Sequence, residues 1–244
     1  MKRKPPPGNV RRVASIDRNI RGITTNKRGC LVQYESELER KLILVLERDA
    51  QVVDFASQPE TLTFQDSAGR SRRYTPDFKV WRADGRFELH EVSVESRRTQ
   101  PRLKEREAAA SAICQERRWR YVIHTEQTLP RGNEYLNLSF LSYYRAPGYV
   151  SVDIVDWWQT QLSVQPGGTH PEAVLAMAAS VIPHGALLSG LYYLIWHNQI
   201  GMDWSQPLIA KGEFHPRARI WLVENAAPGT DGSAWESRYQ EVLS

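Results

Sequence analysis

The 244-residue sequence has very little cysteine, with Cys30 and Cys114 as its only two. Two isolated cysteines exclude a cysteine-rich metal cluster and a disulfide framework, and they suit a reducing cytoplasm. The six histidines show no metal-ligand spacing, which argues against a zinc site. The sequence therefore predicts a cytoplasmic protein whose chemistry depends on neither zinc nor disulfides.

Long apolar runs are also missing. No stretch approaches the roughly 20 apolar residues needed to span a bilayer, and the N-terminus lacks the apolar core of a secretion signal. The hydrophobic content of 41% and the charged content of 25% are typical of a globular protein. The length allows one large domain or two ordinary ones, and we expect no membrane role.

Acidic residues are scarce at the N-terminal end. Before Tyr34 there are nine basic residues and a single acid, Asp17. The same stretch contains a Pro-Pro-Pro-Gly run at 5–8 and little that could form a core. We predict a basic arm over residues 1–33, in which Arg11 and Arg12 lie along DNA phosphates. A tail that only aids solubility is the alternative.

The most informative stretch runs from Tyr74 to Ser93. An Asp-Gly pair between two β-rich runs predicts a hairpin, with Asp77 just inside the first strand and Glu91 along the second. Side chains alternate between faces along a strand, so Lys79 shares a face with Asp77. If the faces meet, two carboxylates come together in an arrangement that suits a divalent cation, although two solvated acids are the simpler alternative.

Residues 35–49 predict a helix that precedes this hairpin. Ser36 is followed three residues later by Glu39, as in a capping box. Glu39 also lies beside the apolar stripe of the helix, so it is either a cap or a metal ligand at the edge of the core. The stripe consists of Leu38, Leu42, Val45 and Leu46.

The segments around the hairpin predict an α/β fold. Short strands are expected at 52–55 and 62–65, and a helix at 102–117 followed by a strand at 119–125 implies a right-handed crossover and a parallel pair. A basic loop leads into the Asp77 strand, where its side chains can hold DNA phosphates or simply face solvent. Its arginines are Arg70, Arg72 and Arg73.

The character of the chain changes at Arg145–Gly148, the best domain boundary. Helices are expected at 152–162, 170–182 and 185–198, and a short hairpin follows them. Three helices and a hairpin describe a winged-helix module, and the many tryptophans suit a packed core or an aromatic protein interface. Residues 225–244 are expected to form a loose tail.

Several signals in order resemble a known family. Pro76-Asp77 followed by Glu91-Val92-Ser93 is similar to the PD-(D/E)xK nuclease core. Together with Ser36–Arg40, Gln58-Pro59 and Tyr74–Phe78, it makes residues 33–146 resemble TnsA, the endonuclease subunit of heteromeric cut-and-paste transposases. The resemblance implies a restriction-endonuclease-like mixed sheet with flanking helices at 34–146 and a winged-helix-like α+β domain at 147–224.

The resemblance also implies an activity. It implies cutting of the non-transferred strand at double-stranded transposon ends with Mg²⁺ or Mn²⁺, beside a TnsB-like transposase and a TnsC-like ATPase regulator. Glu39, Asp77 and Glu91 are the implied catalytic metal ligands, and the carbonyl of Val92 is expected to complete the shell.

One position departs from the pattern. The family carries a lysine where this sequence has Ser93. We therefore expect Lys79, on the strand of Asp77, to supply the missing positive charge. The departure also supports a second hypothesis, in which a catalytically inactive nuclease fold serves as an adaptor between DNA, the transposase and the ATPase. A stand-alone transcription regulator ranks last, because it has no need for the acidic residues.

Overall fold

The computed structural model describes residues 21–146, 148, 150–178, 182–223 and 233–243. The described residues divide into two compact units. The first, here called the N-terminal unit, holds the residues up to Leu129 together with Val242 and Leu243, and the C-terminal unit holds those from Pro130 to Glu241. Within the described ranges, no helix is both long and apolar enough to cross a membrane.

The N-terminal unit is built on a four-stranded sheet in the order β3-β6-β7-β8. Its strands are β3 (Val52–Ser57), β6 (Phe78–Arg82), β7 (Phe87–Val92) and β8 (Arg120–His124). The pairs β3–β6 and β6–β7 are antiparallel, whereas β7–β8 is parallel. The predicted mixed α/β sheet and its parallel crossover are therefore confirmed.

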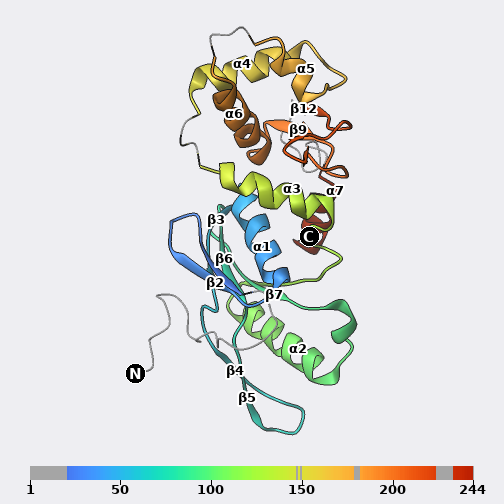
Figure 1. Cartoon of the computed structure of the whole chain (residues 1–244). Helices are drawn as coiled ribbons and strands as arrows, with labels where there is room; N and C mark the ends of the chain where they lie inside the picture. Colours follow the sequence, from blue (N-terminus) through green and yellow to red (C-terminus); the bar gives the residue numbers. More distant parts are fainter. Residues whose placement is uncertain (1–20, 147, 149, 179–181, 224–232, 244) are drawn as a thin grey trace, which may run out of the picture. The chain divides into compact units, whose positions relative to one another are not determined.

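Two helices flank the sheet, and both were predicted. Helix α1 (Glu37–Arg48) begins at Ser36, whose side chain accepts a hydrogen bond from the backbone N–H of Glu39. Helix α2 (Pro101–Glu116) connects β7 to β8 and has a proline in its first turn, where no backbone donor is needed. It packs through Ala110 and Cys114 against Leu89 of β7. Figure 1 shows both helices beside the strands.

The β6–β7 turn follows the Asp-Gly prediction. Gly85 has a φ of 82°, a left-handed conformation that glycine adopts without steric cost. The backbone N–H of Arg82 donates to the carbonyl of Arg86, which closes the turn. Asp77 lies immediately before β6 rather than inside a strand, because β6 begins only at Phe78.

Two segments form hairpins that the sequence predicted only in part, since a strand was expected at 62–65 but not at 22–25, 31–34 or 71–74. Strands β1 (Gly22–Thr25) and β2 (Leu31–Tyr34) pair within the range assigned to the basic arm. Strands β4 (Leu62–Gln65) and β5 (Ser71–Tyr74) also pair, so Arg72 and Arg73 lie on a strand rather than in a loop. Figure 1 shows the β4–β5 hairpin extending away from the four-stranded sheet.

The C-terminal unit begins earlier than the predicted boundary at 146/147. Helix α3 (Asn133–Leu141) and the short 3₁₀ helix η2 (Ser142–Tyr144) belong to it. Phe140 and Tyr144 pack on Tyr192 at ring-centroid distances of 4.9 and 4.7 Å. Asn137 accepts a hydrogen bond from the backbone N–H of Leu208. These contacts attach α3 to this unit, and a change in sequence composition does not reveal them.

The remaining elements of this unit match the prediction in part. They are α4 (Val152–Ser163), α5 (Pro171–Leu175), α6 (His184–Trp196), β9 (Ile200–Met202), β10 (Ile209–Ala210), β11 (Glu213–Phe214), β12 (Ile220–Leu222) and α7 (Ala234–Leu243). Helix α5 is shorter than predicted, since it ends at Leu175, and its N-cap is His170, whose side chain accepts from the backbone N–H of Glu172. Thr169, just before the cap, pairs with Ile220. Helix α7 lies where a loose tail was expected.

Candidate active site

The sheet brings Asp77 and Glu91 together at one end of the β6–β7 pair. Asp77 Oδ2 accepts a hydrogen bond of 2.8 Å from the backbone N–H of Val92, the residue after Glu91. Asp77 is partly exposed, whereas Glu91 is buried. The predicted meeting of two carboxylates therefore occurs, with one of them open to the surface.

Both carboxyl groups are in an environment that opposes their charge. Burial, and then the charge of Glu91, raise the pKa of Asp77 well above its usual range. Burial also raises the pKa of Glu91, although Arg106, Tyr74 and Asp77 act in the opposite direction. Two acids that resist ionisation side by side form a site that a further positive charge would stabilise.

Glu39 forms the predicted cap and also lies near Asp77. Its two carboxylate oxygens accept hydrogen bonds of 2.9 Å from the backbone N–H of Glu35 and from the hydroxyl of Ser36, so it does cap α1. Burial, and then the charge of Asp77, nevertheless raise its pKa to about 7. Glu39 therefore lies close enough to Asp77 to form part of the same electrostatic site.

Two residues that sequence reasoning missed surround Glu91. The guanidinium of Arg106 on α2 donates to Glu91 Oε1 at 2.6 Å, and the hydroxyl of Tyr74 on β5 donates to Glu91 Oε2. The guanidinium also stacks on the Tyr74 ring at 4.7 Å. Arg106 could have been found only from its place on the helix that follows the Glu91 strand, one turn after Arg102.

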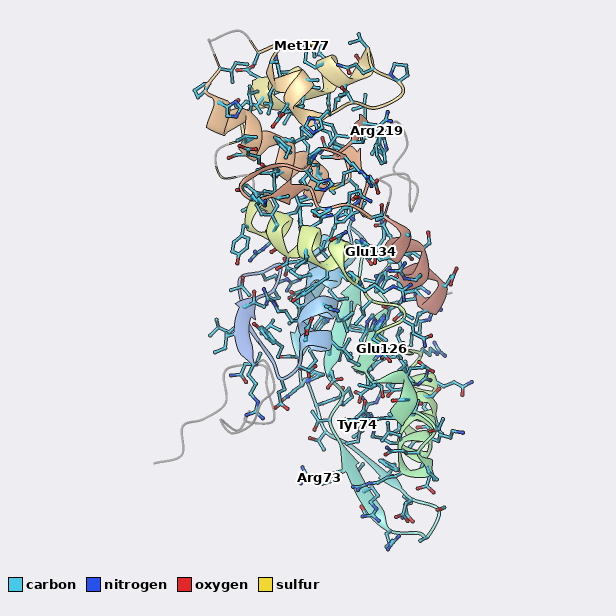
Figure 2. The ribbon with its side chains drawn as sticks, turned by 45° about the vertical axis from the view of Figure 1, so that its right-hand side comes forward. Arg73, Tyr74, Glu126, Glu134, Met177 and Arg219 are labelled. Atoms are coloured by element: carbon cyan, nitrogen blue, oxygen red, sulfur yellow. The ribbon has the colours of Figure 1, made fainter. Side chains whose placement is uncertain are left out.

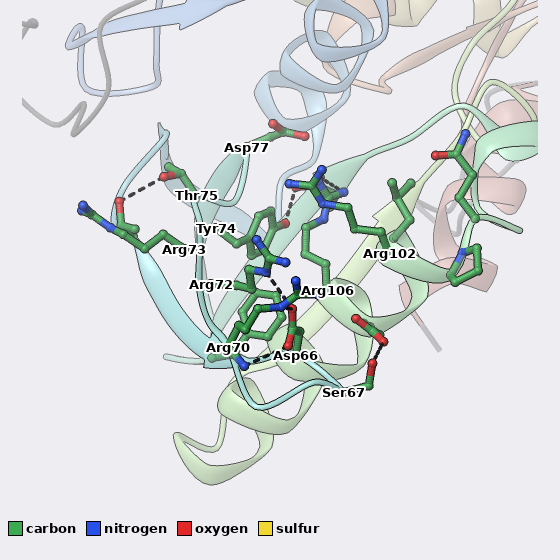
Figure 3. Close-up of a pocket in the computed structure, with 17 residues that line it drawn as sticks. Asp66, Ser67, Arg70, Arg72, Arg73, Tyr74, Thr75, Asp77, Arg102 and Arg106 are labelled. Atoms are coloured by element: carbon green, nitrogen blue, oxygen red, sulfur yellow. Dashed lines mark hydrogen bonds and ion pairs between the residues drawn. The ribbon is translucent and has the colours of Figure 1, made fainter.

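A cavity of about 1020 Å³ adjoins the two carboxylates. The β4–β5 hairpin forms one wall and the start of α2 forms the other, and Figure 3 shows arginines on both. Asp66 partly neutralises the hairpin wall, because it pairs with Arg70 at 3.2 Å and with Arg72 at 2.8 Å. The arginines that line the cavity are Arg70, Arg72, Arg73, Arg102 and Arg106.

The hairpin wall presents alternate side chains to different surroundings. Arg73 and Tyr74 are neighbours on β5, and Figure 2 labels both. Arg73 is exposed, whereas Tyr74 is buried beside Glu91. One strand thus supplies both an accessible cation and a direct partner of the buried carboxylate.

Lys79 is not where the sequence argument placed it. Its register partner is Leu89, so it shares a sheet face with Glu91. Its ammonium, however, lies 3.8 Å from the centre of the Trp119 ring and 5.0 Å from that of Phe87. The aromatic rings at the far end of the strand hold it there, and the cation at the carboxylates is Arg106.

The other predicted residues have mixed outcomes. Arg11 and Arg12 lie outside the described residues. Val92 follows Glu91 as expected and is held to Asp77 through its N–H. Ser93 is buried, and its backbone N–H donates to the carbonyl of His124. No side-chain cation occupies position 93, so any positive charge at the site comes from another element.

The donor set fits a hard divalent cation in its chemistry. Oxygen ligands from carboxylates suit Mg²⁺ or Mn²⁺, and because burial raises the pKa of both Asp77 and Glu91, a bound cation would favour their charged forms. Within the described ranges, however, no group of three or more acidic, histidine or cysteine side chains is placed close enough to hold an ion.

Comparison with known proteins identifies the central part of the chain. Residues 49–126 match the family model described as TnsA-like endonuclease N terminal. The matched range includes Asp77, Glu91 and Arg106, but it does not include Glu39 or the C-terminal unit. A comparison with curated proteins finds no match.

Proposed function

We propose that this chain is a metal-dependent endonuclease subunit of a heteromeric transposase. The premise is that residues 49–126 match the model of the TnsA-like endonuclease N-terminal domain. The chain cuts the non-transferred strand at double-stranded transposon ends. The observation that carries the proposal is the pair Asp77 and Glu91, whose pKa values are raised, at the edge of an arginine-lined cavity.

Asp77 and Glu91 would hold Mg²⁺ or Mn²⁺, and Glu39 and the carbonyl of Val92 would complete the ligand set. A bound divalent ion supplies charge stabilisation for phosphodiester hydrolysis and lowers the pKa of a coordinated water. The cap of α1 does not prevent a role for Glu39, because an ionised carboxylate has about four lone-pair positions and the cap uses two of them. With a pKa of about 7, Glu39 can also exchange a proton near neutral pH.

The arginine-lined cavity would bind the phosphates of the strand to be cut. Arg73 and Arg102 are exposed on opposite walls, and both line the cavity next to Asp77. Arginines are suited to phosphate because their planar fork can donate two hydrogen bonds at once. Arg70 and Arg72 are held on the hairpin by Asp66, which would orient them before DNA arrives. Arg11 and Arg12 would extend this contact from the basic arm.

The C-terminal unit would serve the assembly rather than the chemistry. Three helices (α4, α5 and α6) followed by the β9–β12 pair support the proposal of a winged-helix-like domain. Helix α6 is apolar on nearly all sides and is largely buried, so its surface is poorly suited to reading DNA. We therefore assign this unit to contacts with a TnsB-like transposase or a TnsC-like ATPase regulator.

The experiment is a nicking assay on a transposon-end duplex with the transposase present. Full-length protein should nick the non-transferred strand with Mg²⁺ or Mn²⁺, and excess EDTA should abolish nicking. Nicking that persists in EDTA would refute the metal requirement. Binding of the transposon-end duplex without nicking under any divalent ion would refute the enzyme.

The adaptor hypothesis is the second candidate, and Ser93 is the observation that favours it. If the fold is an inactive adaptor, wild type should bind the duplex and the ATPase without nicking, and Ser93→Lys should restore some cutting. If the protein is an active enzyme, Ser93→Lys should add little or crowd the buried position. The same assay therefore separates the two functions.

A further inference from the structure

Arg106 on α2 is the hydrogen-bonded cation at Glu91. It reaches from α2 to Glu91 and makes an ion pair of 2.6 Å, with 28% of its side chain exposed against 5% for Glu91. Burial opposes its charge, yet the neighbouring Glu91 raises the pKa of Arg106 above its usual value. The pair is therefore a permanent cation held against a buried carboxylate, at the rim of the cavity.

The pairing of Arg106 is incomplete. A guanidinium has five N–H donors in a fixed fork. Among the described residues, the buried Nε of Arg106 has no hydrogen-bond partner, although Nη2 donates to Glu91. A buried donor without an acceptor costs free energy, so this side chain retains a capacity that its present contacts do not use.

The charge balance of the site is incomplete as well. Asp77 and Glu91 are both carboxylates, and Arg106 is the only cation that the described structure shows hydrogen-bonded to either of them. A single positive charge leaves the pair one charge short when both acids are ionised. A divalent ion would complete the balance, but its approach to Glu91 must compete with the Arg106 fork for Oε1.

We propose that Arg106 is a tethered counter-ion that exchanges with the divalent cation at Glu91 and then transfers to a DNA phosphate. This inference rests on the proposed nuclease function and adds an order of events. Before the ion binds, Arg106 shields Glu91. With Glu91 holding a divalent ion, the guanidinium would be released into the arginine-lined cavity, where a phosphate could accept from both Nε and Nη2.

The exchange predicts opposite effects of one substitution on two ligands. Arg106→Gln removes a competing cation, so the affinity for Mn²⁺ should rise by roughly tenfold, the scale set by a hydrogen bond to a charged group. The same change removes a phosphate contact, so the affinity for a transposon-end duplex in the presence of Ca²⁺ should fall. Its log-log salt slope should become shallower by about 0.9.

Arg102→Gln is the matched control. Arg102 lies one turn earlier on α2 and lines the same cavity, and within the described structure it makes no ion pair with Glu91. The Arg102→Gln variant should lose a phosphate contact, so the log-log salt slope of its DNA affinity should become shallower. Its Mn²⁺ affinity should change by less than about twofold. Arg106→Lys keeps the charge without the fork, and it should bind Mn²⁺ about as wild type does.

The measurements are isothermal titration of the full-length protein with Mn²⁺ alone and fluorescence anisotropy with labelled duplex. Thermal melts of each variant check that the fold is intact. If Arg106→Gln and Arg106→Lys bind Mn²⁺ more weakly than wild type, Arg106 positions Glu91 for the ion and the exchange is refuted, while the proposed function stands. If wild type takes up no Mn²⁺ at millimolar concentration, both the exchange and the metal dependence are refuted.

Discussion

The two faces of strand β7 carry similar residues in opposite electrostatic states. On one face Glu91 lies beside Asp77, and burial raises the pKa of both. On the other face Glu88 lies beside His90, and its pKa is lowered, because hydrogen bonding and charge from His90 and Arg82 outweigh the effect of burial. Two buried glutamates, three positions apart on one strand, therefore differ in whether their charge is compensated.

The Glu88 face forms a continuous chain of contacts. His90 Nε2 lies 2.9 Å from Glu88 Oε2, and His124 Nε2 lies 3.0 Å from His90 Nδ1. Burial lowers the pKa of both histidines. With one ring N–H on each histidine, His124 Nε2 can donate to His90 Nδ1, and His90 Nε2 can donate to Glu88 Oε2. Arg82 then links this group to Asp49 at 2.6 Å.

The difference separates a structural network from a functional one. Where the buried charges are paired, the network holds the sheet together and needs nothing from solution. Where two acids at the edge of the cavity share one hydrogen-bonded cation, Arg106, the fold retains an electrostatic cost that a ligand can remove. Substitutions on the two faces should therefore change stability in opposite directions.

The largest expected effect concerns Asp77. Asp77→Asn should abolish metal-dependent nicking, a loss of several orders of magnitude, because one carboxylate of the metal site is removed. In metal-free buffer the same variant should be at least as stable as wild type, since a repelling charge is gone. Nicking and urea unfolding at pH 7.5 measure the two effects. Glu116→Gln, at an exposed acid of α2, is the control, and nicking at wild-type rates by Asp77→Asn would refute the site.

The opposite sign is expected on the other face. Glu88→Gln should lower the free energy of unfolding by on the order of 2–4 kcal/mol, because His90 and Arg82 lose a buried charged partner. Urea unfolding at pH 7.5 measures the change beside that of Asp77→Asn. If Glu88→Gln stabilised the protein, both faces of β7 would carry uncompensated charge, and the proposed difference between them would be wrong.

A pH effect of intermediate size is expected at Glu39. Its folded-state pKa of about 7 lies above the usual value of 4.5, so its contribution to stability is present below pH 4.5 and is lost as the pH rises through about 7. Relative to Glu39→Gln, which can keep the cap, metal-free wild type should lose about 1–3 kcal/mol between pH 5 and pH 8. Subtracting the pH–stability curve of Glu39→Gln from that of wild type removes the contribution of His90 and His124, because both proteins contain these histidines. Parallel curves would mean that Glu39 does not sense Asp77.

The smallest effect is expected at Lys79. Lys79→Met should cost about 1 kcal/mol or less of stability, the scale of a cation–π contact with Trp119. Nicking should be unchanged, because the ammonium lies among aromatic rings rather than at the carboxylates. A loss of nicking by orders of magnitude, with an unchanged melting temperature, would restore Lys79 as the cation of the site.

Much of the N-terminal unit could be predicted from local pattern. The Ser36–Glu39 cap, the Asp-Gly turn and the alternation of β7 are short-range signals whose physics is complete within a few residues. The order strand, helix, strand also determined the parallel pairing of β7 and β8. Together, these local features place Asp77 and Glu91 at one hairpin, but they do not decide between a shared site and two solvated acids.

Other features depended on contacts between distant residues. The attachment of α3 rests on Tyr192 and Leu208, more than 50 positions away, and Thr169, just before α5, pairs with Ile220. Neither contact can be read from a local segment, because a short segment does not reveal what will pack on it.

The sequence by itself determined that Asp77 and Glu91 would lie at one hairpin, since turn chemistry acts locally, but not whether their side chains would meet. Only the tertiary structure decided which cation accompanies them. Lys79 is on the right sheet face but is held by three aromatic rings, whereas Arg106 reaches Glu91 from a helix 15 residues later in the chain. The length and direction of a side chain across packed elements decide that choice, and a linear sequence does not encode them locally.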